Sequence, residues 1–139
     1  MSRLHDMLIR HEGLRLKPYL DTKKKLTIGV GRNLDDVGIT RDEAWALLNN
    51  DIARVRREVK RAFPWFSKVN PVRKDVVLNM VFNLGLQRFR GFRKAIAAIK
   101  AKDWDEAARQ MLDSRWARQV GRRARELAAM MRRGKYESG

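Results

Sequence analysis

The chain changes character between residues 11 and 31, where it reads HEGLRLKPYLDTKKKLTIGVG. Leu26, Ile28 and Val30 alternate there with threonine and glycine, and this two-residue period is typical of a half-buried β-strand. The polar run DTKKK that precedes them is typical of a turn. We therefore expect a short β-hairpin within residues 14–38.

On both sides of this segment the apolar residues recur at the three- and four-residue steps of a helix. The residues that favour helix starts are Ser2, Thr40 with Glu43, Asn70 with Pro71, and Asp103 with Glu106. Gly13, Pro64 and Gly85 are placed to end helices. The fold class we predict is α+β, mainly helical, with a small β-lobe near the N-terminus.

The composition excludes several kinds of chemistry. The 139 residues are enough for one domain, and 44% of them are hydrophobic, which is enough for a core. Cysteine is absent from the sequence, so neither a disulfide framework nor a thiol nucleophile is available. The two histidines, His5 and His11, are too few for a typical histidine-rich zinc site. We expect no metal and no cofactor.

The formal net charge of +16 predicts attraction to polyanions. Nucleic acid, lipopolysaccharide phosphates, anionic membranes and peptidoglycan all qualify as partners. The first residues, MSRLHD, lack the apolar run of a signal peptide, and no stretch approaches the roughly 20 apolar residues of a membrane span. We expect the protein to be made in the cytoplasm.

Two carboxylates flank the predicted hairpin, Glu12 at the end of a helix and Asp21 in a turn. Glycoside hydrolysis uses such a pair, one protonated to donate to the leaving oxygen and one ionised to handle water or the sugar. Thr27 supplies a hydroxyl that can hold the attacking water. The spacing alone is weak evidence, because 16 carboxylates make many pairs and most of them are solvated surface groups.

The residues around this pair resemble the catalytic region of phage-type lysozymes, glycoside hydrolase family 24. The family pattern of Glu, eight residues, Asp, five residues and Thr is met by Glu12, Asp21 and Thr27. The resemblance continues over nearly the whole length through the segments GITRDEA (38–44), NMVFNLG (79–85), GF (91–92), WDEAA (104–108), SRW (114–116) and RA (123–124).

This resemblance implies a two-lobed lysozyme-like fold with the active cleft between the lobes. It implies one lysozyme domain over residues 1–139, with residues 13–60 as the lobe that holds the sheet and residues 1–12 plus 61–139 as the helical lobe. The implied reaction is hydrolysis of the β-1,4 bond between N-acetylmuramic acid and N-acetylglucosamine, with inversion. Glu12 is then the general acid, and Asp21 with Thr27 activates water, with the carboxyl groups roughly 6.5–9.5 Å apart.

Four further residues fall at family positions near the substrate. Asn33, Phe82 and Gln110 match sugar-contacting positions, and Arg123 matches an arginine near the catalytic glutamate. The chain departs from the family as well. It is short between Gly31 and Gly38, and Arg32, Asn33 and Ala95 replace histidine, leucine and a polar residue of some relatives.

The resemblance also implies peptidoglycan as the substrate and release of the enzyme to the cell wall through an opening made by a holin, with lysis of the host cell. We expect a monomer. In the last predicted helix, Leu127, Ala124, Met131 and Ala128 share one sector, and Arg122, Arg125, Arg132 and Arg133 lie opposite. An ordinary packed helix explains this pattern best, and the alternative is that its basic face, with KKK (23–25) and the arginines at 54, 56 and 57, binds lipopolysaccharide or an anionic membrane.

Three rival functions stay open at this point. A nucleic-acid-binding protein fits the charge, although neither a helix-turn-helix pattern nor zinc-ligand spacing is present. A membrane- or wall-binding protein without glycosidase activity would not need Glu12. A lytic transglycosylase would not need Asp21 and Thr27, because no water enters its product.

Overall fold

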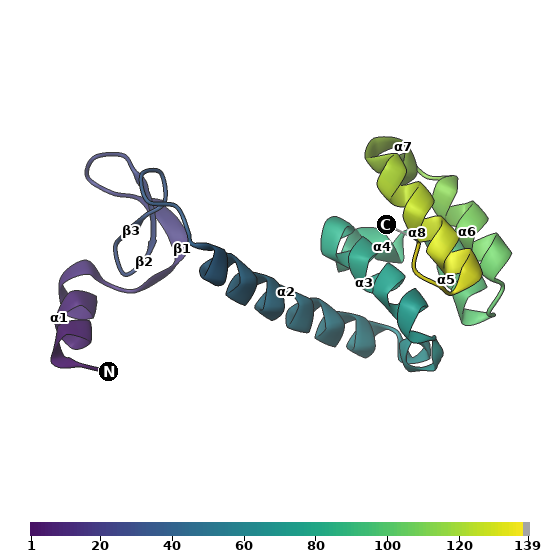
Figure 1. Cartoon of the computed structure of the whole chain (residues 1–139), viewed down its shortest axis with the longest axis horizontal. Helices are drawn as coiled ribbons and strands as arrows, with labels where there is room; N and C mark the ends of the chain where they lie inside the picture. Colours follow the sequence, from purple (N-terminus) through teal and green to yellow (C-terminus); the bar gives the residue numbers. More distant parts are fainter. Residues whose placement is uncertain (138–139) are drawn as a thin grey trace. The chain divides into compact units, whose positions relative to one another are not determined.

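The computed structural model describes residues 1–137, which divide into two compact units, Met1–Leu48 and a second unit that begins at Asn49 (Figure 1). Residues 138–139, which the predicted helical lobe includes, lie outside the described residues. The predicted α+β class is confirmed, since most residues are helical and one small antiparallel sheet is present.

The first unit holds helix α1 (Arg3–Glu12) and the strands β1 (Arg15–Leu20), β2 (Leu26–Gly29) and β3 (Arg32–Asn33), in the order β1-β2-β3. Both strand pairs are antiparallel, so the hairpin expected within residues 14–38 is confirmed and a third short strand is added. Buried and exposed side chains do not alternate regularly along these strands. Within residues 1–48 only the side chain of Thr27 is buried.

Local hydrogen bonds fix both ends of α1. The Ser2 hydroxyl accepts from the His5 N–H, and the His5 side chain bonds back to the Ser2 backbone, which completes a capping box. At the other end the Gly13 N–H donates to Ile9 O, and Gly13 has φ +80°, a conformation that favours glycine. The predicted cap and stop are therefore confirmed. Glu12 is left as the last residue of the helix, directly before β1.

Helix α2 (Arg41–Ala62) begins at the predicted capping box. The Thr40 N–H donates to the Glu43 carboxylate at 2.8 Å, and the Glu43 N–H donates to the Thr40 hydroxyl at 3.1 Å. The buried residues of α2, Val55 and Val59, both lie in its second half. The helix ends two residues before Pro64, as expected.

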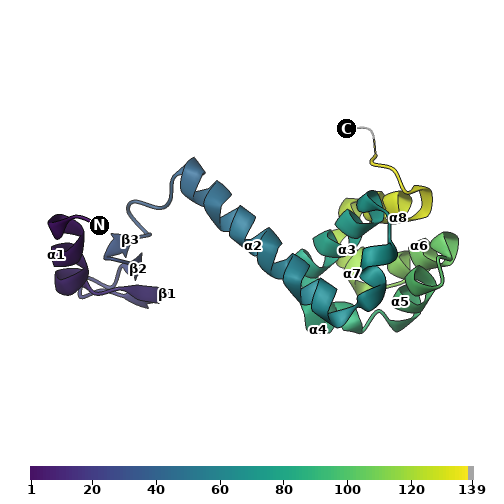
Figure 2. The same ribbon diagram turned by 90° about the horizontal axis from the view of Figure 1, so that it is seen from below.

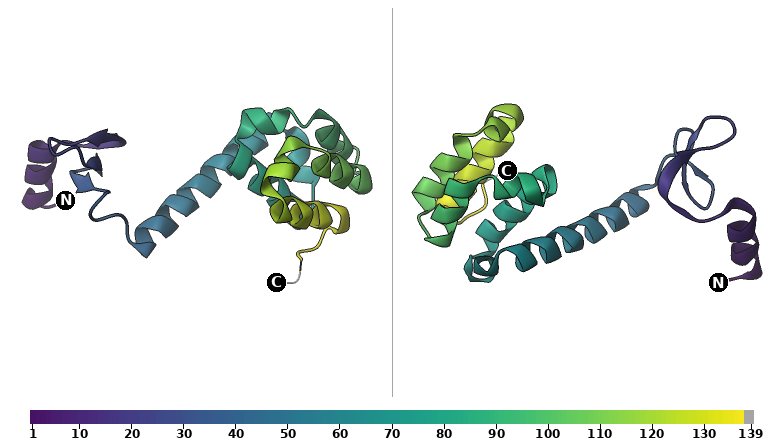
Figure 3. Two further views of the ribbon diagram at one scale, coloured as in Figure 1. Left: turned by 90° about the horizontal axis from the view of Figure 1, so that it is seen from above. Right: turned by 180° about the vertical axis from the view of Figure 1, so that it is seen from behind.

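The second unit is helical. After α2 it contains a short 3-10 helix (Pro64–Lys68) and then α3 (Pro71–Leu84), α4 (Leu86–Arg90), α5 (Arg93–Lys100), α6 (Trp104–Leu112), α7 (Arg115–Val120) and α8 (Arg122–Arg133). Helix α6 packs against both α5 and α8, and α8 also packs against α3, as two further views show (Figures 2 and 3).

All the buried apolar side chains among residues 1–137 lie in this second unit, from Val55 to Met131. Helix α3 is buried on most of its circumference, with Val76, Val77 and Met80 fully covered. The rings of Phe63, Phe89, Phe92 and Trp116 form a connected series of aromatic contacts. The second unit therefore has a core of its own.

Two predicted helix starts in this unit are confirmed, one of them in modified form. The Asn70 side chain accepts from the Arg73 N–H, and Pro71 occupies the first turn of α3. Asp103 caps α6 by accepting from the Glu106 N–H. The expected return bond from the Glu106 carboxylate is replaced by bonds from Arg109 and Gln110, so the cap is only half of a capping box.

Helix α8 is a packed amphipathic helix. Its buried residues include Ala124, Leu127, Ala128 and Met131, the sector predicted from the sequence, whereas the four predicted basic positions are exposed. The interpretation as an ordinary packed helix is confirmed. The division into a lobe of residues 13–60 and a lobe of residues 1–12 plus 61–139 stays a prediction.

Candidate active site

Glu12 lies where α1 ends, and its carboxyl group rests against the turn between β2 and β3. A Cβ atom built on Gly31 would lie 2.8 Å from Glu12 Oε2 and 3.1 Å from Glu12 Cδ. The side chain of Glu12 is exposed, and within residues 1–137 it has neither a hydrogen-bond nor an ion-pair partner. Its carboxyl group is therefore open to solvent.

Asp21 is held by the turn between β1 and β2. Its Oδ1 accepts from the backbone N–H groups of Lys23 and Lys25, both at 2.8 Å. Its own N–H donates to Lys25 O, which closes the turn. The two bonds to Oδ1 fix the carboxyl group and leave Oδ2 without a bonded partner among the described residues.

Thr27 lies in β2, two residues beyond Lys25, and is 3% exposed. Its hydroxyl donates to Lys25 O at 2.8 Å. The main chain of Lys25 is thus bonded to both Asp21 and Thr27, so the two predicted site residues are held together by one backbone segment. With its proton committed to Lys25, the Thr27 hydroxyl has lone pairs left to accept from a donor such as water.

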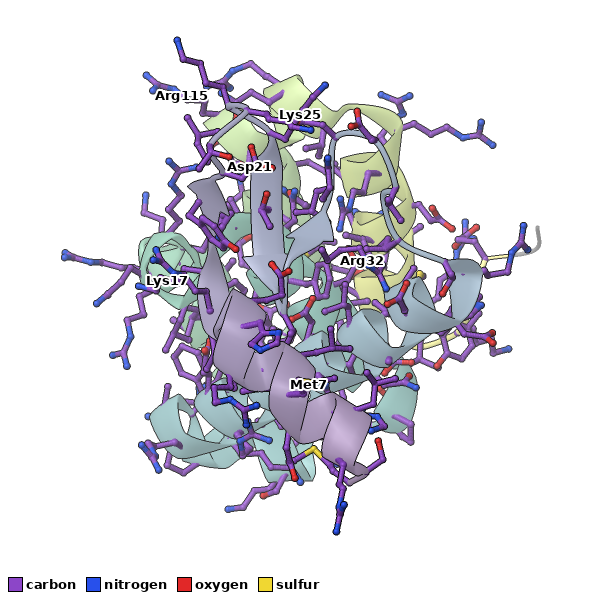
Figure 4. The ribbon with its side chains drawn as sticks, turned by 90° about the vertical axis from the view of Figure 1, so that its left-hand side faces the viewer. Met7, Lys17, Asp21, Lys25, Arg32 and Arg115 are labelled. Carbon is purple, nitrogen blue, oxygen red and sulfur yellow. The ribbon has the colours of Figure 1, made fainter. Side chains whose placement is uncertain are left out.

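Strand β2 separates the two acids. Asp21 is anchored at Lys25, just before the strand, and Glu12 contacts Gly31, just after it. In Figure 4 the labelled Asp21 and Lys25 lie at the turn end of the hairpin, away from α1, which carries Met7. The four residues of β2 span roughly 10 Å at about 3.3 Å per step.

An ion pair fixes the strand that follows Gly31. Arg32 donates to Glu43 through two parallel bonds of 2.9 and 2.8 Å, and it also donates to Gly38 O at 3.0 Å. Because the Arg32 guanidinium bonds to it, and the Thr40 N–H does so as well, the pKa of Glu43 is lowered to about 2. This ion pair joins β3 to the first turn of α2, and Glu43 stays ionised at neutral pH.

Asn33, the fourth predicted site residue of the first unit, is engaged within its own loop. Its amide donates to Asp36 Oδ2 at 2.9 Å, and its carbonyl oxygen accepts from the Asp36 N–H at 3.0 Å. This arrangement shapes the short connection to α2, the segment in which the chain departs from the family pattern. Its predicted contact with a sugar stays a prediction.

Phe82 and Arg123 belong to the second unit. Phe82 lies on α3 and is 46% exposed, whereas its neighbours Val81 and Met80 are buried. Arg123 lies at the start of α8 and donates to Asn79 Oδ1 through two nitrogen atoms, at 3.0 and 2.8 Å. An exposed aromatic ring and an oriented guanidinium suit contacts with a carbohydrate, and both roles stay predictions.

Gln110 lies on α6 and donates to Glu106 at 2.8 Å. It lines an open pocket of about 450 Å³ together with Ala95, one of the positions at which the chain departs from the family, and with Phe92, Asp113 and Ser114. Gly91 and three cations, Arg88, Arg93 and Lys94, complete the lining. Among residues 1–137, no three His, Asp or Glu side chains are grouped as metal ligands would be.

Comparison with known protein families shows which family this chain belongs to. The family described as "Phage lysozyme" matches residues 9–137. The chain belongs to the phage lysozyme family. Its enzyme class follows from this membership: it is a lysozyme, a glycosidase.

Similarity to individual proteins is consistent with this family membership. The chain is 27% identical to a probable T4-type lysozyme of Dictyostelium discoideum, with 96% of each chain covered. It is 30% identical to the pre-baseplate central spike protein of Enterobacteria phage T4, over 96% of this chain but only 28% of that protein. It is 34% identical to an endolysin of Acyrthosiphon pisum secondary endosymbiont phage 1, over 60% of this chain and 58% of the relative.

The sequence of this phage lysozyme predicts Glu12 and Asp21 as its acids but does not reveal the groups that contact them. The roles of Gly31, against Glu12, and of the bonds from Lys23 and Lys25 to Asp21 are set by backbone geometry. Only the glycine pair Gly29 and Gly31 was a visible signal, because glycines in a strand often mark a close approach of another group.

Proposed function

We propose that this phage lysozyme hydrolyses the β-1,4 bond between N-acetylmuramic acid and N-acetylglucosamine in peptidoglycan, with inversion. Glu12 protonates the leaving oxygen, and Asp21 accepts a proton from the water that attacks the opposite face of the sugar. Thr27 accepts a hydrogen bond from that water and orients it. The observation that carries the proposal is that Asp21 is bonded within the turn before β2, whereas Glu12 lies against Gly31 in the turn after it.

The separation supports an inverting reaction. Retaining enzymes need carboxyl groups about 5 Å apart so that one can attack the sugar, and inverting enzymes need roughly 6.5–9.5 Å to admit water. Asp21 is anchored at Lys25, before β2, and Glu12 contacts Gly31, beyond it. The four residues of β2 alone span roughly 10 Å, which favours the wider separation. The three bonds of Asp21 keep it in the turn, where it can act on water.

The test compares wild type with Glu12→Gln and Asp21→Ala on purified peptidoglycan, followed by turbidity. We expect each variant to lose activity by about a hundredfold or more, because each removes a proton-transfer group. Asp6→Asn is the matched control, since it neutralises another exposed carboxylate of α1. Substantial lysis by Glu12→Gln would reject the proposal and favour a binding protein without glycosidase activity.

Product analysis separates the remaining alternatives. Mass spectrometry of the released muropeptides should show one added water per cleaved bond, whereas a lytic transglycosylase would give products lighter by one water. NMR of the first product should show the α-anomer, since inversion of a β-linkage produces it. A β-anomer would leave the enzyme a muramidase but overturn the assigned role of Asp21.

We also propose host cell lysis as the setting, with release through an opening made by a holin. Among residues 1–137 no helix is long and apolar enough to cross a membrane. One relative is named an endolysin. Lysis of cells that express the enzyme only when a holin is co-expressed would support this setting, and lysis without a holin would reject it.

A second candidate function is binding to an anionic envelope surface such as lipopolysaccharide. Residues 49–139 hold 23 of the 32 Lys and Arg residues and nine of the 16 Asp and Glu residues, so they carry a formal charge of +14, against +2 for residues 1–48. The apolar sector of α8 is buried, so this helix offers charge and no inserting face. Among residues 1–137, Arg132 and Arg133 are paired with Asp105 and Glu137, whereas Arg122 and Arg125 make no ion pair there.

This binding should therefore fall steeply with salt. Replacing Arg122 and Arg125 with Gln should weaken binding to lipopolysaccharide more than the same change at Arg132 and Arg133. Equal or absent effects would reject a role for α8. Tighter binding to duplex DNA than to lipopolysaccharide at matched salt would favour the nucleic-acid alternative.

A further inference from the structure

The carboxyl group of Glu12 has one close neighbour, and that neighbour is a glycine. A Cβ on Gly31 would lie 2.8 Å from Oε2, 3.1 Å from Cδ and 3.3 Å from Cγ of Glu12. Three atoms of the glutamate therefore lie over the Cα of Gly31, in the space that any other residue would fill with its side chain. Real Cβ atoms almost never come within 3.0 Å of another heavy atom.

No polar group among the described residues restrains the carboxyl group of Glu12. Within residues 1–137 the Glu12 carboxyl group has no hydrogen-bond donor and no cation bonded to it. A free glutamate side chain has three rotatable bonds and samples many staggered rotamers. The contact with Gly31 is thus the feature of the first unit that limits where the carboxyl group can lie.

The turn that carries Gly31 is held on the far side. Ile28 pairs with Arg32 across the turn, and Thr27 pairs with Asn33. Arg32 is bonded to Glu43 and to Gly38 O, so the residue next to Gly31 is tied to the start of α2. Gly31 is therefore a fixed surface rather than part of a loose loop.

We propose that Gly31 is the positioning residue for Glu12: its missing side chain makes the place in which the carboxyl group rests. The inference rests on the proposed function, in which Glu12 is the proton donor. A general acid must lie within about 3 Å of the oxygen that it protonates, and a displacement of about 1 Å can reduce the rate a hundredfold.

A methyl group on Gly31 would displace Glu12 rather than unfold the protein. The atoms that it meets are the far end of a flexible side chain, which can rotate away. The backbone cost is separate, since Gly31 has φ +69° and any L-residue is strained there. The chain offers a matched control in the same turn: Gly29 has φ +70°, and a Cβ there would meet no atom within 4 Å.

The experiment compares wild type, Gly31→Ala and Gly29→Ala on soluble peptidoglycan fragments. Both variants share the strain of alanine at positive φ, so both should lose thermal stability, and Gly31→Ala should lose somewhat more because its methyl group also meets Glu12. We expect kcat of Gly31→Ala to fall by about tenfold to a hundredfold with KM within about twofold of wild type. Gly29→Ala should keep kcat within about threefold of wild type. The basic limb of the kcat–pH profile, which reports the proton donor, should move only in Gly31→Ala.

Equal kcat values and equal pH profiles for the two alanine variants would overturn the inference. A double-mutant cycle tests the contact without using activity. In a Glu12→Ala background the atoms that meet the new methyl group are gone, so Gly31→Ala should lower Tm less than it does beside Glu12. Equal losses of Tm in both backgrounds would overturn it. Glu12→Gln separates the two proposals: if this variant stays active, the proposed function fails, whereas the Tm cycle still decides the contact.

Discussion

The pKa of Glu43 is strongly lowered by its two bonded partners, Arg32 and Thr40. One substitution can separate the effects of these two partners. The carboxylate accepts both bonds from Arg32 and also caps α2 by accepting from the Thr40 N–H. Glutamine keeps the capping bond, because its amide oxygen also accepts, but it loses the ion pair. Glu43→Gln therefore isolates the contribution of Arg32.

The expected result depends on pH in a defined direction. The pKa of Glu43 is about 2 in the folded protein, because Arg32 bonds to the carboxylate, and an unfolded glutamate has a value of about 4.3. The stabilising contribution is thus fully present above about pH 5 and is lost as pH falls toward 2. Tm of wild type should exceed Tm of Glu43→Gln at pH 6, and the gap should narrow at pH 3.

Asp42→Asn is the control, since it removes the same charge from the same turn of α2 without breaking the pair. Its Tm gap should differ little between pH 6 and pH 3. A gap for Glu43→Gln that is constant across this range would contradict the assignment of the low pKa to Arg32.

At the scale of elements, the end of α8 is stabilised by one arginine from α3. Arg73 donates to Met131 O at 2.6 Å and to Arg132 O at 2.9 Å, and its guanidinium stacks 4.0 Å from the centre of the Trp104 ring. Burial lowers its pKa. Lysine cannot reproduce two directed bonds together with a planar stack, so Arg73→Lys should lower the free energy of unfolding by about 1–3 kcal/mol.

Urea denaturation monitored by far-UV circular dichroism would measure this loss. Arg122→Lys provides the comparison, because Arg122 is an exposed arginine of α8 that makes neither a hydrogen bond nor an ion pair with the described residues. It should change the free energy of unfolding by less than about 0.5 kcal/mol. Similar values for the two variants would show that the bonds of Arg73 add nothing.

The elements that the sequence predicted best are those with a chemical start signal. The caps at Ser2, Thr40 and Asn70 all form, because each needs only a side-chain oxygen and an N–H group three residues away. The short helices α4, α5 and α7 went unpredicted, since five to eight residues hold too little periodicity to detect. Strand β1 was unclear for a related reason: it is mostly exposed, so burial imposes no alternation on it.

The candidate site also has a part that the sequence predicts and a part that it does not. The acids Glu12 and Asp21 stood out by residue type and spacing, because their chemistry resides in their side chains. The groups that place them are a bare Cα at Gly31 and two backbone N–H groups at Lys23 and Lys25. Every residue type except proline offers a backbone N–H, so the two contacts made by N–H groups cannot be predicted from a pattern of residue types.

At the scale of the whole molecule, buried apolar residues and net charge are both distributed unevenly between the two units. The 24 buried apolar residues among residues 1–137 all lie beyond residue 48, and the first unit buries only Thr27. Since burial of apolar surface is the main stabilising contribution to folding, the two units should differ sharply as isolated fragments. A three-stranded sheet without a buried apolar face does not reach independent stability.

We therefore expect a fragment of residues 49–139 to keep its helical circular dichroism and to unfold cooperatively on heating, with some loss of Tm. A fragment of residues 1–48 should show no cooperative transition and little protection in amide hydrogen exchange, because it has no core of its own to lose. A variant of the larger fragment with Val76→Ala tests the assignment of the core, since Val76 is fully buried in α3 and its truncation should lower Tm further. A cooperative transition in residues 1–48, or a gradual melt of residues 49–139, would mean that the stability of this lysozyme is not set by the apolar residues that its second unit buries.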